Sequence, residues 1–116
     1  MNIEEIREYC ITKNGVSENF PFDKKTLVFK VGGKMFALIG LDNNFINLKC
    51  EPELAIERRE KFAEITAGYH MNKKHWNSVD YTKGLSFKFV KQMIDESYGL
   101  VFNSLTKKER EQINNL

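Results

Sequence analysis

The sequence has few of the residues and patterns that mark several common classes of protein. It contains only two cysteines among 116 residues, too few for the disulfide framework of a small secreted domain. Cys10 and Cys50 stand in apolar surroundings, which are typical of small core residues. No apolar run approaches the roughly 18 residues that a membrane-spanning helix needs, and no secretory signal peptide is predicted at the first residues. We therefore expect a reduced, cytoplasmic protein with no membrane association.

Catalytic and metal-binding signatures are missing as well. The chain has no Gly-rich phosphate loop, no Cys-x-x-Cys pair and no His-Glu-x-x-His motif. Its two histidines, His70 and His75, lie in a segment without helical periodicity, and two histidines alone rarely hold zinc. Neither cysteine stands in a context typical of a reactive nucleophile. We expect no enzyme activity, no cofactor and no metal.

What the chain does contain is enough apolar material for one hydrophobic core. Its apolar fraction of 41% includes nine Phe, four Tyr and one Trp, a content that disordered chains lack. The length predicts a single domain over residues 1–116. The formal net charge of +2 is too near neutral to indicate nucleic acid binding by itself. The charge is uneven, however, because residues 67–116 carry +3 and residues 1–66 carry −1.

Four helices are predicted from periodic apolar residues and from start signals. They cover residues 2–13, 52–65, 86–104 and 106–114. Asn2 with Glu5, and Thr106 with Glu109, have the spacing of capping boxes. In the second helix we expect the charged residues, Arg58 among them, to be solvated.

A glycine pair indicates a β-hairpin in the first half of the chain. Gly32-Gly33 separates two apolar runs, and both glycines can take positive φ. A two-residue turn would pair Phe29 with Phe36 and Leu27 with Leu38, which places all four side chains on the core face. The predicted strands cover residues 26–31, 34–41, 45–50 and 75–80.

The resulting order, α-β-β-β-α-β-α-α, predicts an α+β fold of two layers, with helices packed on an antiparallel sheet. Residues 16–25 are predicted to be a connection, which Phe20 and Phe22 pin onto the core. A further short strand at 69–71 stays open as an alternative.

The segment from residue 69 to residue 79 holds both histidines, the only tryptophan and a lysine pair. Within it, Asn72-Lys73-Lys74-His75-Trp76-Asn77-Ser78-Val79 resembles the central signature of the MmcQ/YjbR family. Several further segments match the same family in the same order, namely Phe20-Pro21-Phe22, Lys30-Val31-Gly32-Gly33-Lys34-Met35-Phe36-Ala37, Cys50-Glu51-Pro52-Glu53-Leu54-Ala55 and Asp95-Glu96-Ser97-Tyr98. One departure is Asp80-Tyr81-Thr82-Lys83-Gly84, which stands where many members carry Leu-Asp-Gly-Ser, so we expect a loop of different shape there.

This resemblance covers nearly the whole chain. It implies a compact α+β fold similar to that of frataxin/CyaY-like proteins and of secretion chaperones. It also implies a double-wing DNA-binding motif, although the family as a whole lacks an established activity.

DNA is the first partner that we expect, bound through the hairpin wing and the basic central segment. The candidate DNA-binding residues are Lys30, Lys34, Asn72, Lys73, Lys74, His75, Trp76 and Asn77. The lysines would contact phosphates, the tryptophan would stack on a base, and the asparagines would bind base edges or phosphates. The same residues have a structural alternative, in which Trp76 is a core anchor, His75 is a structural histidine, and Asn72 and Asn77 stabilise turns.

Two other functions stay open. A protein-interaction or chaperone-like module would expose an apolar patch of several hundred Å². A frataxin-like iron role would need Glu4, Glu5 and Glu8 to converge with Asp23 or other acidic residues. A monomer is favoured for each of these functions.

Overall fold

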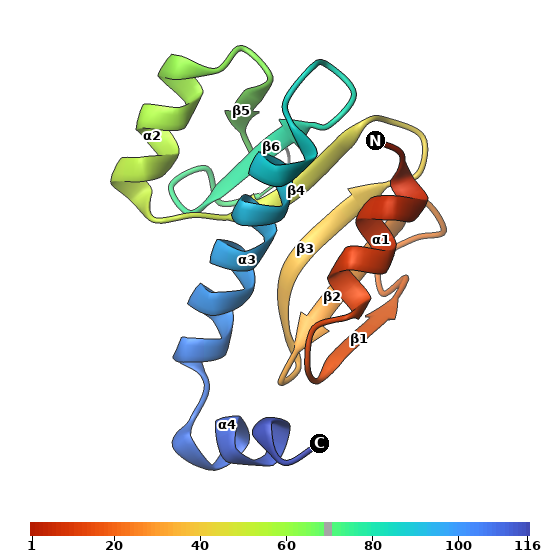
Figure 1. The fold of residues 1–116 in the computed structure, drawn as a ribbon, viewed down its shortest axis with the longest axis vertical. Coiled ribbons are helices and arrows are strands. Elements are labelled where there is room, and N and C mark those ends of the chain that lie inside the picture. Colours follow the sequence, from red (N-terminus) through yellow and green to blue (C-terminus); the bar gives the residue numbers. More distant parts are fainter. Residues whose placement is uncertain (69–70) are drawn as a thin grey trace.

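A six-stranded antiparallel sheet forms the centre of the fold, and helices pack around it (Figure 1). The computed structural model describes residues 1–68 and 71–116. The strands lie in the order β1-β2-β3-β4-β6-β5, and this arrangement confirms the predicted α+β class. The elements in chain order are α1 (Ile3–Ile11), β1 (Val16–Asn19), β2 (Thr26–Val31), β3 (Lys34–Gly40), β4 (Phe45–Lys49), α2 (Pro52–Lys61), β5 (Ile65–Ala67), β6 (Trp76–Asp80), α3 (Phe87–Ser104) and α4 (Lys107–Asn114).

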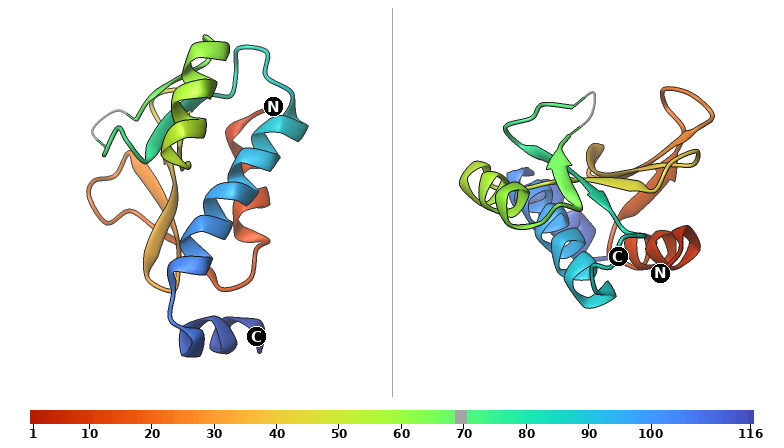
Figure 2. Two further views of the ribbon diagram at one scale, coloured as in Figure 1. Left: turned by 90° about the vertical axis from the view of Figure 1, so that its left-hand side faces the viewer. Right: turned by 90° about the horizontal axis from the view of Figure 1, so that it is seen from above.

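The two faces of the sheet are covered differently. Helices α1 and α3 lie against one face, and α2 lies beside β5 and β6 (Figure 2). The large core on the helical face includes Ile6, Phe29, Phe36 and Ile94, all fully buried. On the opposite face no helix of the described residues packs. There the segments 20–25 and 71–75 rise from the sheet (Figure 2, right), and we call this side the free face.

The helix starts follow the predicted signals. Asn2 with Glu5 forms a complete capping box at α1, and Thr106 with Glu109 forms one at α4. Helix α2 ends earlier than predicted, at Lys61 rather than at residue 65. The next residue has extended backbone angles, because the chain turns there towards β5. No helix in residues 1–68 and 71–116 has the length and apolar character needed to cross a bilayer.

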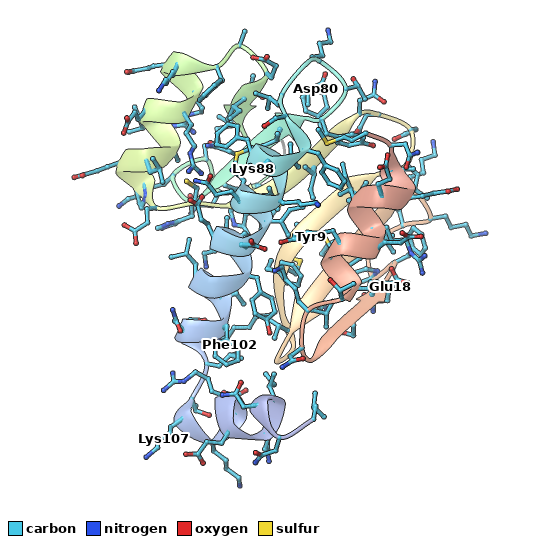
Figure 3. All side chains as sticks on the ribbon, in the orientation of Figure 1. Tyr9, Glu18, Asp80, Lys88, Phe102 and Lys107 are labelled. Carbon is cyan, nitrogen blue, oxygen red and sulfur yellow. The ribbon has the colours of Figure 1, made fainter. Side chains whose placement is uncertain are left out.

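Helix α1 is joined to α3 by polar contacts as well as by apolar packing. Tyr9 on α1 points towards α3 (Figure 3), and its hydroxyl donates a hydrogen bond of 2.7 Å to the Asp95 carboxylate. The Lys13 ammonium donates to the same carboxylate oxygen. Burial, together with the hydrogen bond to Asp95, raises the pKa of Tyr9 to about 12. This phenol therefore stays protonated and keeps donating throughout the neutral range.

The β2–β3 hairpin turns at Gly32-Gly33, as predicted, but its register differs from the predicted one. Beyond the turn, Phe36 is an extra residue that forms a bulge. Leu38 consequently pairs with Val28, not with Leu27, and faces the free face. The prediction that Leu38 lies on the core face was wrong, because one additional residue in a strand reverses the facing of every side chain after it.

Two edge strands were not predicted. Strand β1 lies within the segment expected to be a connection, and β5 follows the early end of α2. Both are short, and each is extended because it pairs with a longer neighbour, Val16 with Val31 and Ile65 with Val79. The possible strand at 69–71 involves residues 69 and 70, which lie outside the described residues.

The hairpin turn packs closely against the segment that leads into α4. Gly32 has a φ of +57°, and a Cβ built on it would lie 2.7 Å from both δ-methyl carbons of the buried Leu105. Gly33 has a φ of +77°, but nothing lies within 4 Å of the corresponding Cβ position. The two adjacent glycines therefore share a left-handed backbone and differ in the space around them.

Replacing Gly32 with alanine is expected to lower the free energy of unfolding by about 2 kcal/mol, because backbone strain and displacement of Leu105 add together. The matched variant Gly33→Ala has only the backbone strain and should lose about 1 kcal/mol. Urea denaturation of both proteins measures the difference. Equal losses would contradict the close packing of Gly32 against Leu105.

Candidate functional site

The free face carries a groove of about 650 Å³. The segment 20–25 borders it on one side and residues 71–72 border it on another, while β3 and β4 supply much of the remainder. We call this the free-face groove. Its lining residues are Phe22, Asp23, Thr26, Met35, Leu38, Gly40, Asn43, Asn47, Met71 and Asn72.

A small apolar cluster supports this groove. Val28, Leu38 and Trp76 are buried together on the free face, apart from the main core. Met35 and Met71 pack partly buried against them and also line the groove. The groove is therefore apolar along the part that lies over the cluster.

A second hollow of about 370 Å³ continues over β4, β5 and β6. It shares Asn43 and Asn47 with the free-face groove and adds Phe45, Thr66 and Ser78 to the lining. The two hollows are adjacent, so both apolar and amide side chains line much of the free face. A surface of this kind can contact both the flat faces and the polar edges of a ligand.

Each of the two segments that border the groove carries a pair of exposed lysines. These pairs are Lys24-Lys25 and Lys73-Lys74. Lys25 also lies 3.6 Å from the Asp42 carboxylate, but both side chains are mostly exposed, so solvent weakens this ion pair. The borders of the groove are therefore positively charged on both segments.

One acidic side chain, Asp23, lines the groove and is hydrogen-bonded to the backbone. Asp23 accepts hydrogen bonds from the backbone N–H groups of Lys25 (2.8 Å) and Thr26 (2.7 Å). These hydrogen bonds hold the pKa of the Asp23 carboxyl below its ordinary value, and the bond from Lys25 contributes most. The carboxylate is thus part of the turn that shapes the segment.

The second segment is held in place by hydrogen bonds of its own. The Asn72 side-chain oxygen accepts from the backbone N–H of Lys74 at 2.9 Å, and the Lys73 carbonyl accepts from the Arg59 guanidinium at 2.8 Å. The role of Asn72 in a turn is thereby confirmed.

The structure distributes the predicted DNA-binding residues over different places. Lys73 and Lys74 are exposed beside the groove together with Asn72, and His75 is half-buried at the end of the same segment. Lys30 is half-buried and pairs with the groove residue Met35.

Lys34 lies elsewhere, at the tip of the hairpin. It is exposed and close enough to Glu109 of α4 to contribute to the lowered pKa of that carboxyl, which is caused mainly by the hydrogen bonds from Thr106. The hairpin tip therefore meets α4, and it does not border the groove.

Trp76 and Asn77 are both buried. Trp76 is 8% exposed and packs against Val28 and Leu38, which fits the alternative in which it is a core anchor. Asn77 faces the helical side, where its side-chain nitrogen donates to the carbonyl of Ala55 in α2 at 3.3 Å. The Asn77 side-chain oxygen has no hydrogen-bond partner among the described residues. All five residues of β6 are buried, because packing covers both faces of this strand.

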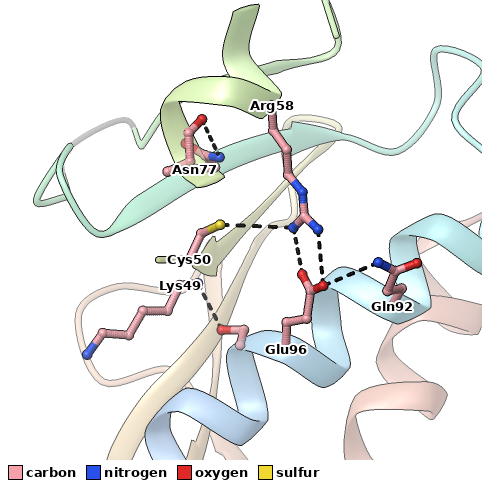
Figure 4. Close-up of polar contacts among 8 residues, drawn as sticks. Lys49, Cys50, Arg58, Asn77, Gln92 and Glu96 are labelled. Carbon is pink, nitrogen blue, oxygen red and sulfur yellow. Dashed lines mark hydrogen bonds and ion pairs between the residues drawn. The ribbon is translucent and has the colours of Figure 1, made fainter. Parts of the chain in front are cut away.

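A polar network that the sequence did not reveal joins α2 to α3 (Figure 4). Arg58 donates two hydrogen bonds to the Glu96 carboxylate, at 2.6 and 3.0 Å, and its guanidinium also lies 3.9 Å from the Cys50 sulfur. The expectation that Arg58 is solvated was wrong, because this bidentate pair draws its side chain into the interior. Partial burial alone would raise the pKa of Glu96, but the hydrogen bonds from Arg58 and Gln92, together with the positive charge of Arg58, outweigh it and hold that pKa below its ordinary value.

The next residue on α3 joins the helix to the sheet. The hydroxyl of Ser97 accepts from the backbone N–H of Lys49 at 2.8 Å and donates to the Phe36 carbonyl. Two of the sequence segments that resemble the MmcQ/YjbR pattern, the one at 50–55 and the one at 95–98, thus lie at one structural junction (Figure 4).

Acidic side chains do not gather into a metal site in the part of the chain that the structure describes. No three His, Cys, Asp or Glu side chains lie close enough together there to hold an ion. Glu4, Glu5 and Glu8 accordingly do not converge with Asp23.

The fold is that of a small α+β protein, in which helices cover one face of an antiparallel sheet. Residues 11–100 match the YjbR family model, and the chain belongs to the YjbR family. The resemblance noted in the sequence is thus confirmed.

Similar proteins share the fold over most of their length. The chain is 36% identical to the uncharacterised protein YbdF of Escherichia coli O157:H7, over 81% of this chain and 79% of the relative. It is 30% identical to the uncharacterised protein YjbR of Escherichia coli K12, over 95% of each. A crystal structure of a Deinococcus radiodurans protein with a DUF419 domain superposes with a TM-score of 0.89 at 34% identity, covering 97% of this chain and 88% of the other. A Pseudomonas syringae structure superposes with a TM-score of 0.74 at 30% identity, covering 87% of this chain and 99% of the other.

Proposed function

We propose that this protein binds DNA through the free face of its sheet. The observation that carries the proposal is the pair of basic borders, Lys24-Lys25 on one segment and Lys73-Lys74 on the other, beside one groove. Both segments rise on the same side of the sheet (Figure 2, right). The exposed lysines of the two segments can meet the regular negative charge of a phosphate backbone.

Other residues of the free face could also contact DNA. Lys30 adds a further positive charge on the strand beside the groove. The amides of Asn43, Asn47 and Asn72 also line the groove. Such groups hydrogen-bond to phosphates or to base edges, so the lysines would supply most of the affinity and the amides would orient the ligand.

The proposal keeps the basic central segment that the sequence indicated, but it replaces the hairpin wing with another segment. The segment 20–25 takes the place assigned to the hairpin tip, because Lys34 lies beside Glu109 at α4. The overall net charge of +2 is small, and the local arrangement of lysines therefore matters more than the total.

Fluorescence anisotropy with a labelled forked DNA, which has a duplex part and two unpaired tails, tests the proposal. We expect saturable binding at low salt that weakens steeply towards physiological salt. In the double variant Lys73→Ala/Lys74→Ala, the slope of log affinity against log salt should become shallower by about 1.5, because each phosphate contact contributes roughly 0.7–0.9. Binding should weaken for all DNA sequences alike.

The matched control is Lys107→Ala/Lys108→Ala on α4, which removes the same charge from another exposed lysine pair. It should leave most of the salt slope in place. Equal effects of the two double variants, or no binding of the fork even at low salt, would refute DNA binding by the free face.

A protein-interaction module is the second candidate, and exposed aromatic side chains favour it. Phe22 is 66% exposed at the groove, and Phe20 nearby is 46% exposed. A displayed peptide library selected on this protein, with Phe22→Ala as the counter-selection, would test this candidate. Peptides that bind only the unmodified protein, together with no binding of the fork, would favour it over DNA binding.

A further inference from the structure

We infer that the free-face groove holds unpaired bases, so that the DNA bound by this protein is single-stranded. This inference rests on the DNA binding proposed above and adds the form of DNA that the groove selects. It is carried by the recessed apolar lining between the two basic borders.

The recess suits a flat apolar group more than the outside of a duplex. A volume of about 650 Å³ falls within the range of pockets that enclose small organic ligands, roughly 300–1,000 Å³. A duplex presents phosphates and base edges, while its base faces are stacked inside. The apolar lining would stay exposed to water under a duplex, whereas an unpaired base could bury it.

The side chains of the lining are of the kinds that contact aromatic rings well. Met35 and Met71 place polarizable thioethers beside the groove, and Leu38 of the buried cluster also lines it. Phe22 is 66% exposed on the segment that borders the groove, so its ring has surface free for a second ring to stack on. Stacking on aromatic side chains is the usual means of holding unpaired bases without sequence preference.

Amide groups lie where the polar edge of such a base would need partners. The Asn43 side-chain oxygen accepts from the backbone N–H of Phe45 at 3.0 Å, and the Asn47 oxygen accepts from the hydroxyl of Ser78. With their oxygens engaged, both side chains have NH₂ groups to offer, and every base edge carries acceptors for such donors. The lysine pairs on the two borders would meanwhile hold the phosphates on either side of the base.

The test compares three labelled strands of equal length by anisotropy, namely a single strand of mixed sequence, its duplex, and a strand with abasic sugars in the central positions. We expect the single strand to bind roughly tenfold more tightly than the duplex, and the abasic strand to lose a similar factor, as base stacking implies. Phe22→Ala should weaken single-strand binding roughly tenfold and leave duplex binding unchanged.

Phe20→Ala is the matched control, because Phe20 lies on the same segment and is exposed but does not line the groove. It should leave single-strand binding unchanged. Neither side chain is buried, so both variants are expected to fold, and far-UV circular dichroism checks this.

The possible failures are distinguishable. Duplex binding as tight as single-strand binding, or an abasic strand bound as well as the intact one, would overturn this inference while DNA binding stands. Absence of binding to every DNA form would remove both proposals. Peptides that bind through Phe22 when no DNA binds would make the groove a peptide site and overturn the inference as well.

Discussion

Replacing Trp76 with alanine is expected to lower the free energy of unfolding by about 3–5 kcal/mol. The indole is 8% exposed and forms, with Val28 and Leu38, the only buried apolar cluster on the free face within residues 1–68 and 71–116. Its removal leaves a cavity between the sheet and the groove, where the described residues include no helix that could move in to fill it. Urea denaturation followed by circular dichroism measures the loss.

Phe22→Ala serves as the control for this experiment, because its ring is largely exposed and its loss should change stability by less than about 0.5 kcal/mol. Trp76→Phe should recover much of the stability and bind DNA as the unmodified protein does. A loss below about 1 kcal/mol for Trp76→Ala would contradict the core role. Loss of DNA binding in a stable Trp76→Phe protein would show that Trp76 takes part in DNA binding.

Replacing Glu96 with alanine is the second substitution with a large expected effect, a loss of about 3 kcal/mol. It leaves the buried Arg58 guanidinium without the carboxylate that accepts two of its hydrogen bonds. Since the Glu96 side chain is 35% exposed, water can reach the site and the loss should fall at the lower end of the range for buried pairs. The double variant Arg58→Met/Glu96→Leu should recover most of the stability, because it removes both charges. Equal instability of the single and double variants would show that packing, and not the unpaired charge, causes the loss.

Acidification provides a second measurement on the same pair. The folded pKa of Glu96 lies below its ordinary value, so the unfolded chain takes up a proton there before the folded chain does. The stabilisation is therefore complete above the ordinary glutamate pKa of about 4.3 and is lost as the pH falls through the folded pKa. The stability difference between the unmodified protein and Glu96→Gln should shrink over that acid range. A difference independent of pH would contradict the ion pair.

The sequence predicts those parts of the fold that local signals specify. Capping boxes locate the starts of α1 and α4, and the glycine pair locates the β2–β3 turn. Strands β1 and β5 have no local sequence signal of this kind. Their extended conformation depends on pairing with a neighbouring strand. The bulge at Phe36 and the burial of Arg58 likewise depend on partners that are distant in the sequence.

The candidate site is less predictable than the fold for the same reason. The exposed Lys73-Lys74 pair could be identified from composition, but its counterpart Lys24-Lys25 becomes part of the site only through the strand order of the sheet. Phe20 and Phe22 were expected to pin their segment onto the core, and this was wrong. The segment rises from the free face, whereas the large core lies on the helical face, so neither ring belongs to that core.

The position of β6 has a consequence for the order in which the molecule assembles. Strands β1 to β4 pair with their neighbours along the chain, whereas β6 must return across α2 and β5 to pair with β4. Closing the longer loop costs more chain entropy, so the first four strands can associate before β6 docks. The groove is lined by residues 22–47 from the first part and by residues 71–72 from the second. A ligand bound there would therefore contact residues from both parts of the chain and stabilise the native state.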